Sequence, residues 1–241
     1  MIEVKNFKKS FGQKLIHKDV TFKVGKGECM GLIGGSGAGK SVILRSLIGL
    51  EKPDSGSIYI DNEEISKYRE SELVNIRKKV AYVFQGGALF DSMTVFENLA
   101  YPLKEHTKYS DKEIQTLIID QLKEFGLENN ENLYPGSLSG GMQKRVGLAR
   151  SLMMHPNVIL YDEPTAGLDP YNTKKIQDHI LKLKAQGMTS ILVTHDMPTA
   201  FAVCDKMAFL LNGKIAFEGK LDEIQEDRTG IVQKFINGDA H

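Results

Sequence analysis

The segment 34–41 constrains this chain more than any other part of its sequence. It reads Gly-Gly-Ser-Gly-Ala-Gly-Lys-Ser, which fits the phosphate-loop pattern G-x-x-x-x-G-K-[ST]. The continuous apolar run Cys29–Ile33 precedes it, and apolar residues at helical spacing follow it at 42–48. A buried strand, a glycine loop and an amphipathic helix in this order predict an α/β domain that binds phosphate.

The residue types of this segment suit a nucleoside triphosphate. Glycines let successive backbone N–H groups converge on phosphate oxygens, and the following helix adds its positive N-terminal end. Lys40 can place its charge on the β- and γ-phosphates, and the Ser41 hydroxyl can coordinate Mg²⁺. A chance match in a glycine-rich turn is the alternative, which the flanking strand and helix disfavour. The predicted ATP-binding residues of the loop are Gly34, Gly35, Ser36, Gly37, Ala38, Gly39, Lys40 and Ser41.

Two carboxylates follow a second apolar run. Residues 158–161, Val-Ile-Leu-Tyr, read as a buried strand, and Asp162 and Glu163 come directly after it. Asp162 can hold a water of the Mg²⁺ shell, while Glu163 points elsewhere and can polarise an attacking water. Alone, the pair could be a solvated acidic turn before Pro164. Beside a phosphate loop, it predicts Mg²⁺-dependent hydrolysis of ATP.

A second glycine-containing helix start lies at residues 138–142, Leu-Ser-Gly-Gly-Met. Ser139 is placed as an N-cap, and Gly140 and Gly141 fall in the first turn, where free backbone N–H groups suit a phosphate. A plain capped helix is the alternative. No buried strand precedes the segment, so it is not a second phosphate loop. We expect it to grip the γ-phosphate held by another copy of the chain, in a two-fold arrangement.

The rest of the chain predicts an α/β core with helices inserted in its middle, and residues 238–241 predict a terminal tail. Strands are expected at residues 2–7, 20–24, 29–33, 58–60, 80–84, 158–161, 190–194, 206–211 and 214–217, with a turn at 53–56. Helices are expected at 94–103, at 139–153, and up to residue 126 behind a capping box of Ser110 and Glu113. The chain is therefore predicted to be a single α/β domain, residues 1–241. Its core comprises 1–84 and 157–241, and its helical subdomain is near 85–156.

Charge and hydropathy narrow the possible partners. Lysine plus arginine equals aspartate plus glutamate, 31 against 31, so no overall field attracts nucleic acid or anionic lipid. The longest apolar runs have the length of core strands, and we expect no direct insertion into a membrane. Cys29 and Cys204 lie far apart in the sequence. They form no metal-like pair and are expected to be buried thiols in a reducing compartment.

Together these motifs resemble the ATP-binding subunits of ABC transporters, over nearly the whole chain. The resemblance identifies segment 34–41 as the Walker A loop and segment 138–142 as the signature motif. Asp162 and Glu163 match the Walker B pair. Met142 departs from the family, which usually has glutamine there; in this chain a glutamine follows at Gln143.

Four single residues extend the resemblance. Gln85, just after the expected strand 80–84, matches the Q-loop residue that touches Mg²⁺, and His195 matches the switch histidine near the γ-phosphate. Phe11 is placed like the aromatic residue that stacks on adenine, and Asp169 belongs to a D-loop at the dimer seam. Each has a simpler alternative, as a loop, core or structural residue. Their order and spacing favour the functional roles.

The resemblance implies a P-loop NTPase of the ABC-ATPase type, with a mixed sheet, an N-terminal antiparallel β part and an inserted helical subdomain. It implies ATP and Mg²⁺ as cofactors, with catalytic roles for Glu163, His195 and Gln85. Implied metal contacts are Ser41, Gln85 and, through water, Asp162; implied contacts across the dimer are Ser139, Gly140, Gly141 and Asp169. The implied partners are a second copy of the chain and integral-membrane permease subunits, at the cytoplasmic face of the inner membrane.

A narrower likeness lies after Gln85. Residues 84–90 (Phe-Gln-Gly-Gly-Ala-Leu-Phe), 93–98 and 101–107 look like the Mla-type phospholipid transporter ATPases, which work with an MCE substrate-binding protein. In the family, residues just after the Q-loop form the groove for the permease's coupling helix, so this stretch is expected to track the permease type. The main alternative is the ATPase of an ABC importer or exporter of another solute.

Two further classes of protein share parts of this pattern. A small-molecule kinase would have the phosphate loop but should lack the helix start at 139–142. A soluble ABC-type factor of DNA repair or translation usually has a long coiled-coil insertion or two fused nucleotide domains, and this sequence has neither.

Overall fold

A computed structural model describes residues 2–225 together with Gly230, Val232 and Phe235. The described strands are β1 (Ile2–Phe11), β2 (Lys14–Val24), β3 (Cys29–Ile33), β4 (Ser55–Ile60), β5 (Glu63–Glu64), β6 (Val80–Val83), β7 (Val158–Asp162), β8 (Thr189–Val193), β9 (Lys206–Leu211) and β10 (Lys214–Lys220). The described helices are α1 (Lys40–Leu47), α2 (Glu70–Lys79), α3 (Val95–His106), α4 (Asp111–Glu124), α5 (Gly140–Leu152), α6 (Pro170–Ala185), α7 (Met197–Val203) and α8 (Leu221–Gln225). A short 3₁₀ helix, Pro135–Ser137, precedes α5.

All these strands form one mixed sheet, in the order β5-β4-β1-β2-β10-β9-β3-β8-β7-β6. β1 pairs antiparallel with β2 and β4, with Ile2 opposite Val24 on one side and Ile60 on the other. β3 is parallel to β8 and β9, and β7 is parallel to β6 and β8. The predicted α/β class, with an N-terminal antiparallel part and a parallel core, is confirmed.

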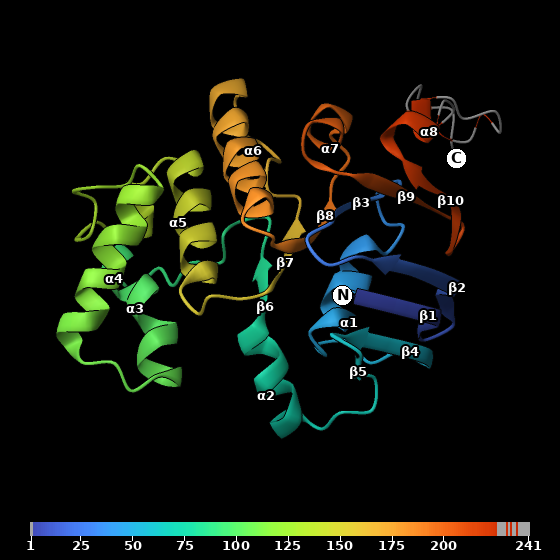
Figure 1. Ribbon diagram of the computed structural model, residues 1–241, viewed down its shortest axis with the longest axis horizontal. Coiled ribbons are helices and arrows are strands. Elements are labelled where there is room, and N and C mark those ends of the chain that lie inside the picture. Colours follow the sequence, from blue (N-terminus) through green and yellow to red (C-terminus); the bar gives the residue numbers. More distant parts are fainter. Residues whose placement is uncertain (1, 226–229, 231, 233–234, 236–241) are drawn as a thin grey trace.

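The parallel strands are buried on both faces because helices cover each side. Along β3, Met30 and Leu32 pack with α1 on one face, whereas Cys29 faces the opposite cluster with α6 and α7. β7 alternates in the same way, and its Tyr161 lies on the same face as Cys29. Figure 1 shows α6 and α7 on one side of the sheet and α1 on the other. Packing on both faces fixes the positions of the strand ends, where the predicted site residues lie.

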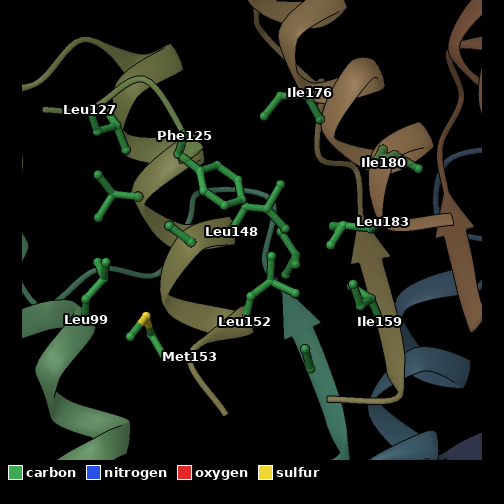
Figure 2. Packing of buried hydrophobic residues seen from close by; sticks show 14 of the residues in the cluster. Leu99, Phe125, Leu127, Leu148, Leu152, Met153, Ile159, Ile176, Ile180 and Leu183 are labelled. Atoms are coloured by element: carbon green, nitrogen blue, oxygen red, sulfur yellow. The ribbon is translucent and has the colours of Figure 1, made fainter. Parts of the chain in front are cut away.

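The helical part of the chain shares one apolar cluster with the sheet. Leu99 of α3 packs with Leu148 and Leu152 of α5, and the same cluster includes Ile159 of β7 and Ile176 of α6 (Figure 2). The apolar face of α4 joins it through residues buried at helical spacing. Residues of α5 and of β7, the strand that ends in Asp162, belong to the same apolar cluster. A shift of α5 must therefore disturb the packing around β7.

The predicted capping box starts α4 as expected. Ser110 N–H donates to Glu113 Oε2 at 2.7 Å, and Ser110 Oγ accepts from the Glu113 N–H group at 3.4 Å. The same arrangement at Thr94 and Glu97 starts α3. α3 reaches His106, three residues beyond the predicted end.

Several local predictions need correction. α2 was not predicted, because only Leu73 and Ile76 in it are buried and such a narrow apolar stripe gives a weak pattern. β4 begins at Ser55, within the turn expected at 53–56, because its first residues pair with β1. Phe84 lies beyond the end of β6 and is 39% exposed. The tail expected at 238–241 lies outside the described residues.

The two cysteines are buried and free, as the sequence predicts. The fold also brings them together, since the Sγ atoms of Cys29 and Cys204 lie 3.9 Å apart. The backbone brings them together, since Asp205 N–H donates to the Cys29 carbonyl at 2.8 Å and Asp205 Oδ2 accepts from Cys29 N–H at 2.9 Å. No helix in the described part of the chain is long and apolar enough to cross a membrane.

Candidate active site

One cavity of about 750 Å³ gathers most of the predicted nucleotide residues. It lies between the phosphate loop, the end of β1 and the segments that follow β6, β7 and β8. Its lining comprises Phe11, Ile16, Ser36, Gly37, Gly39, Lys40, Ser41, Val42, Arg45, Gln85, Glu163, Val193 and His195. Residues separated by up to 184 positions in the chain therefore face the same space, as the resemblance requires.

The phosphate loop has a backbone that favours glycine. Gly37 and Gly39 have φ values of 75° and 93°, in the left-handed region. A Cβ atom on Gly34 would lie 2.7 Å from the carbonyl oxygen of Leu210. Together these constraints hold the loop in an open turn at the N-terminus of α1, the positive end of the helix, which suits an anion.

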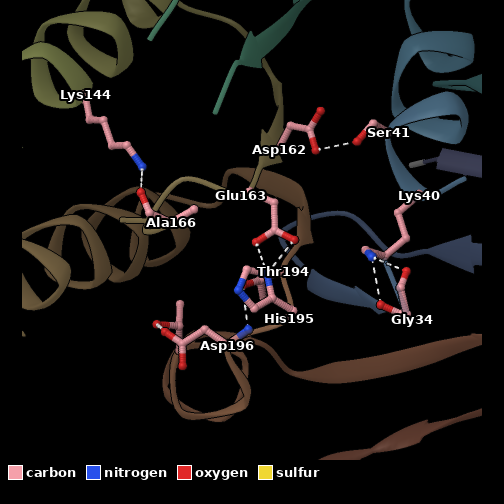
Figure 3. Close-up of polar contacts among 12 residues, drawn as sticks. Gly34, Lys40, Ser41, Lys144, Asp162, Glu163, Ala166, Thr194, His195 and Asp196 are labelled. Carbon is pink, nitrogen blue, oxygen red and sulfur yellow. Dashed lines mark hydrogen bonds and ion pairs between the residues drawn. The ribbon is translucent and has the colours of Figure 1, made fainter. Parts of the chain in front are cut away.

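Lys40 is folded back over this loop. Its Nζ donates to the carbonyl oxygens of Gly34 at 2.7 Å and Gly35 at 3.0 Å (Figure 3). Burial lowers the pKa of Lys40, and the nearby Glu163 and Asp162 carboxylates oppose that shift. The ammonium group is thus stored against the loop that it would serve, within reach of a bound phosphate.

Asp162 is held by two hydroxyl groups. Ser41 Oγ donates to Oδ1 at 2.8 Å, and Tyr82 Oη donates to Oδ2 at 2.7 Å (Figure 3 draws the Ser41 contact). Burial, together with this bond, raises the pKa of Tyr82 far above its usual range, so Tyr82 stays a donor. Tyr82 was not among the predicted site residues, because its position in β6 gave only a strand pattern.

Glu163 turns away from Asp162 because its backbone is left-handed. Its φ is 51°, which is uncommon for a residue with a side chain, and its N–H donates to the Val193 carbonyl at 2.9 Å. Strain of this kind costs about 1–3 kcal/mol and concentrates at functional sites. The turn brings Glu163 to the cavity wall and away from Asp162.

His195 lies directly against that carboxylate. Its Nδ1 is 3.0 Å from each oxygen of Glu163, and the hydrogen bond is to Oε1 (Figure 3). The other oxygen, Oε2, is buried, and the same Nδ1 lies 3.0 Å from it. Glu163 also lines the cavity, where a carboxylate can accept a hydrogen bond from water.

The signature segment does not line the cavity of its own chain. Ser139 caps α5, where its Oγ accepts from Met142 N–H at 3.3 Å. Asp169 caps α6, and it accepts from Asn172 N–H at 2.9 Å; these bonds lower the pKa of its carboxyl. α5 and α6 start side by side, since a Cβ atom on Gly141 would lie 2.5 Å from the Asn172 side chain. The predicted residues therefore form two groups, one in the cavity and one outside it.

Gln143 does not replace the glutamine that the family usually has at the position of Met142. Its Nε2 donates to the carbonyl oxygens of Pro135 at 2.9 Å and Leu138 at 3.3 Å, within its own chain. The next residue, Lys144, was not predicted at all. Its Nζ donates to the Ala166 carbonyl, which ties α5 to the segment between Glu163 and Asp169 (Figure 3).

The described residues contain no group of three or more His, Cys, Asp or Glu side chains that could hold a metal ion. Ser41 and Asp162, joined by a 2.8 Å hydrogen bond, offer one hydroxyl and one carboxylate beside the phosphate loop. That suits Mg²⁺, which usually takes one or two protein oxygens together with phosphates and water.

Two residues outside the cavity hold the segment after Gln85. Asn98 is fully buried, and its Nδ2 donates to the carbonyl oxygens of Phe90 and Met93, both at 3.1 Å, and Thr94 at 3.0 Å. Arg150 donates to the carbonyls of Gly87 at 3.1 Å and Ala88 at 2.8 Å, and to Asn98 Oδ1 at 3.3 Å. The sequence did not identify either residue, because all of these hydrogen bonds depend on the folded loop.

Replacing Asn98 with alanine should destabilise the protein by about 2–4 kcal/mol, because it removes a fully buried amide and the bonds it makes to Phe90 N–H and the Met93 carbonyl. Urea unfolding measures this free energy. Gln115→Ala on the exposed face of α4 is the control and should cost less than about 0.5 kcal/mol. Equal stability of the two variants would show that Asn98 does not hold the loop.

A known protein family matches most of this chain. The model of the ABC transporter family matches residues 17–166. The chain belongs to the ABC transporter family. This ABC protein is similar to a probable ribonucleotide transport ATP-binding protein of Mycobacterium leprae, with 43% identity over 98% of this chain and 69% of the relative. It is also similar to a methionine import ATP-binding protein of Bacillus cereus, with 40% identity over 98% of this chain and 71% of the relative.

A plant relative and a solved structure complete the comparison. The chloroplastic protein trigalactosyldiacylglycerol 3 of Arabidopsis thaliana is 40% identical, over 99% of this chain and 74% of the relative. An ATP-binding cassette solved as a dimer in a post-hydrolysis state, with ADP and Pi, superposes with a TM-score of 0.85 at 35% identity. The match covers 92% of this chain and 99% of that cassette. The predictions of the ABC-ATPase fold, of ATP hydrolysis, and of ATP and Mg²⁺ as cofactors are confirmed.

Proposed function

We propose that this ABC ATPase drives phospholipid transport between membranes of a bacterial envelope. In this proposal it works at the cytoplasmic face of the inner membrane, with permease subunits and an MCE-type lipid-binding protein. The observation that carries the proposal is a groove outside the nucleotide cavity. Its wall contains the residues on which the Mla-type likeness rests, among them Phe84, Phe90, Tyr101, Pro102 and His106.

The groove has a volume of about 550 Å³ and a largely apolar wall with basic residues. Phe90 and Tyr101 pack with ring centroids 5.1 Å apart, and both are more than 40% exposed. Lys78 and Arg150 add positive charge, and a third basic residue of the wall, Arg77, is paired with Glu70. An amphipathic permease helix with an apolar face and an acidic residue would complement this surface. The residues that differ by transporter type would then be the ones that contact the permease.

The nucleotide cavity suggests a role for each of its residues. Phe11, 45% exposed at the end of β1, would stack on the adenine base. Lys40 would leave the Gly34 and Gly35 carbonyls to bind phosphate, and Ser41 and Asp162 would hold Mg²⁺, directly and through water. Gln85, exposed at the same cavity, would contact the metal and report on the nucleotide to the groove beside it.

Hydrolysis would depend on Glu163 and His195. The Glu163 carboxylate would orient water for in-line attack, and His195 would stabilise the closed site near the γ-phosphate. The chain would need a second copy to close that site. Ser139, Gly140, Gly141 and Asp169 lie outside their own cavity, which supports a role for them at the γ-phosphate of a partner. Reopening after hydrolysis would move the helical subdomain, near 85–156, and the permease with it.

An importer or exporter of another solute is the second candidate. The relatives named for ribonucleotide transport and for methionine import favour it, whereas the plant relative carries the name of a glycerolipid. The nucleotide cavity does not distinguish a phospholipid transporter from a transporter of another solute, because every ABC ATPase needs the same triphosphate chemistry. The permease that binds in the groove does distinguish them.

Purification of the intact membrane complex through this subunit tests the proposal. We expect a permease, an MCE-type protein and a glycerophospholipid enriched over the bulk membrane, identified by mass spectrometry. Tyr101→Arg should reduce the recovered permease, whereas Tyr109→Arg, on an exposed tyrosine outside the groove, should not. A complex that contains a binding protein for a soluble solute, and no enriched lipid, would favour the second candidate.

A further inference from the structure

His17 is a fully buried histidine that the proposed mechanism does not use. It lies in β2, next to Ile16, which lines the nucleotide cavity. Its ring packs against Phe7 with centroids 5.3 Å apart. Its Nε2 lies 3.1 Å from the carbonyl oxygen of Gly39, the N-cap residue of α1 in the phosphate loop.

The contact defines how the ring is protonated. A carbonyl oxygen only accepts hydrogen bonds, so Nε2 must carry the hydrogen. The other nitrogen, Nδ1, is buried and has no hydrogen-bond partner among the described residues, so a second hydrogen there would have no acceptor. Burial lowers the pKa of His17, although the bond to Gly39 opposes that shift. The ring is therefore a neutral donor through Nε2.

The Gly39 carbonyl lies where the phosphate loop passes into α1. It also accepts from Val42 N–H at 2.9 Å and Ile43 N–H at 3.2 Å, which start α1. The described chain has no cis peptide bonds, and in a trans peptide the C=O and the following N–H point in opposite directions. With the Gly39 carbonyl directed at His17, the Lys40 N–H points to the other side of the loop.

The fit between ring and loop is close. A Cβ atom on Gly39 would lie 2.6 Å from Cε1 and Nε2 of His17, and Gly39 has a φ of 93°. A residue with a side chain at position 39 would therefore displace the histidine. The strand is held on its other side, since Lys18 N–H donates at 2.8 Å to the carbonyl of Gly213, in the turn between β9 and β10.

We propose that His17 is a positioning residue for nucleotide binding: its Nε2–H group holds the Gly39 carbonyl and so directs the Lys40 N–H group at the triphosphate. The inference rests on the proposed role of segment 34–41 as the triphosphate cradle. Backbone N–H groups at such a helix start bind phosphate only when they converge on it. A loop without this bond samples other orientations of the Gly39–Lys40 peptide and binds ATP more weakly.

The test compares two substitutions. His17→Leu removes the donor and keeps an apolar side chain, and it should raise the Kd for Mg·ATP about tenfold, the effect expected for one hydrogen bond. His17→Gln offers an amide N–H in place of Nε2–H and should restore affinity to within about threefold of the parent. Fluorescent-nucleotide titration measures both Kd values. The two variants should have the same midpoint of thermal unfolding without nucleotide. Parental affinity in His17→Leu would overturn the proposal.

A measurement on the unsubstituted protein does not depend on how the variants fold. The ring nitrogens of His17, observed by ¹⁵N NMR at neutral pH, should show the Nε2–H tautomer, and the Nε2–H resonance should shift when Mg·ATP binds. An Nδ1–H tautomer or a doubly protonated ring would overturn the proposal. Lys40→Ala tests the role of segment 34–41 independently of His17. If Lys40→Ala still binds ATP normally, segment 34–41 is not the triphosphate site. If only Lys40→Ala loses binding, His17 has no positioning role.

Discussion

Replacing Glu163 with glutamine should leave ATP bound while lowering turnover by about two to four orders of magnitude. The structure gives the reason. The side chain enters the cavity through a left-handed turn, and both of its carboxylate oxygens lie 3.0 Å from His195 Nδ1. Glutamine keeps the shape of the side chain and its neighbours. It lacks the negative charge that would draw a proton from water.

Nucleotide binding and ATP hydrolysis by Glu163→Gln are measured separately. The ATPase rate should fall, the Kd for Mg·ATP should stay within about threefold, and size-exclusion chromatography with ATP should show a long-lived dimer. Glu128→Gln, on an exposed glutamate beyond α4, is the matched control and should hydrolyse ATP normally. Normal hydrolysis by Glu163→Gln would refute Glu163 as the residue that orients water.

Replacing Ser139 with arginine should abolish hydrolysis and leave nucleotide affinity close to the parent value. Ser139 lies at the start of α5, outside the cavity of its own chain. A large cation there would block the approach of the signature segment to the γ-phosphate of a partner. Because the chain's own phosphate loop is unchanged, ATP should still bind.

The loss of a helix cap needs its own control. Ser139→Arg also removes the hydrogen bond from Met142 N–H, and a lost cap costs about 1 kcal/mol. Ser110→Arg removes the equivalent cap of α4, far from the proposed seam, and should keep hydrolysis. If Ser139→Arg lost nucleotide binding, Ser139 would serve the site of its own chain.

The same two-chain hypothesis predicts rescue in a mixture. Lys40→Ala and Ser139→Arg should each be inactive, but a dimer of one copy of each retains one intact site, formed by the unaltered phosphate loop of one chain and the unaltered signature segment of the other. With random pairing and independent sites, the mixture should recover about a quarter of the parental rate.

The parts of the fold that follow from local pattern were predictable. Strand, glycine loop and helix around segment 34–41, and the capping box at Ser110, need only neighbouring residues, and the structure has them. α2 was missed because two buried residues in ten leave little periodicity. The resemblance supplied Gln85 and Phe11, which no local pattern would have assigned to the same cavity.

Contacts between distant strands were not predictable. The adjacency of Cys29 and Cys204, 175 positions apart, depends on the register of the sheet and on where α7 ends. The bond from Tyr82 to Asp162 depends on the parallel pairing of β6 and β7. The left-handed φ of Glu163 has no mark in the sequence either, because glycine is the residue that usually occupies such a turn.

The measurement that tests the account most directly is the ATPase rate per chain as the purified protein is diluted, with the monomer and dimer fractions followed by analytical ultracentrifugation. If each site needs the signature segment of a second copy, the rate per chain should rise with the dimer fraction and fall toward zero where only monomer is present. A rate per chain that stays constant down to fully monomeric protein would contradict the account.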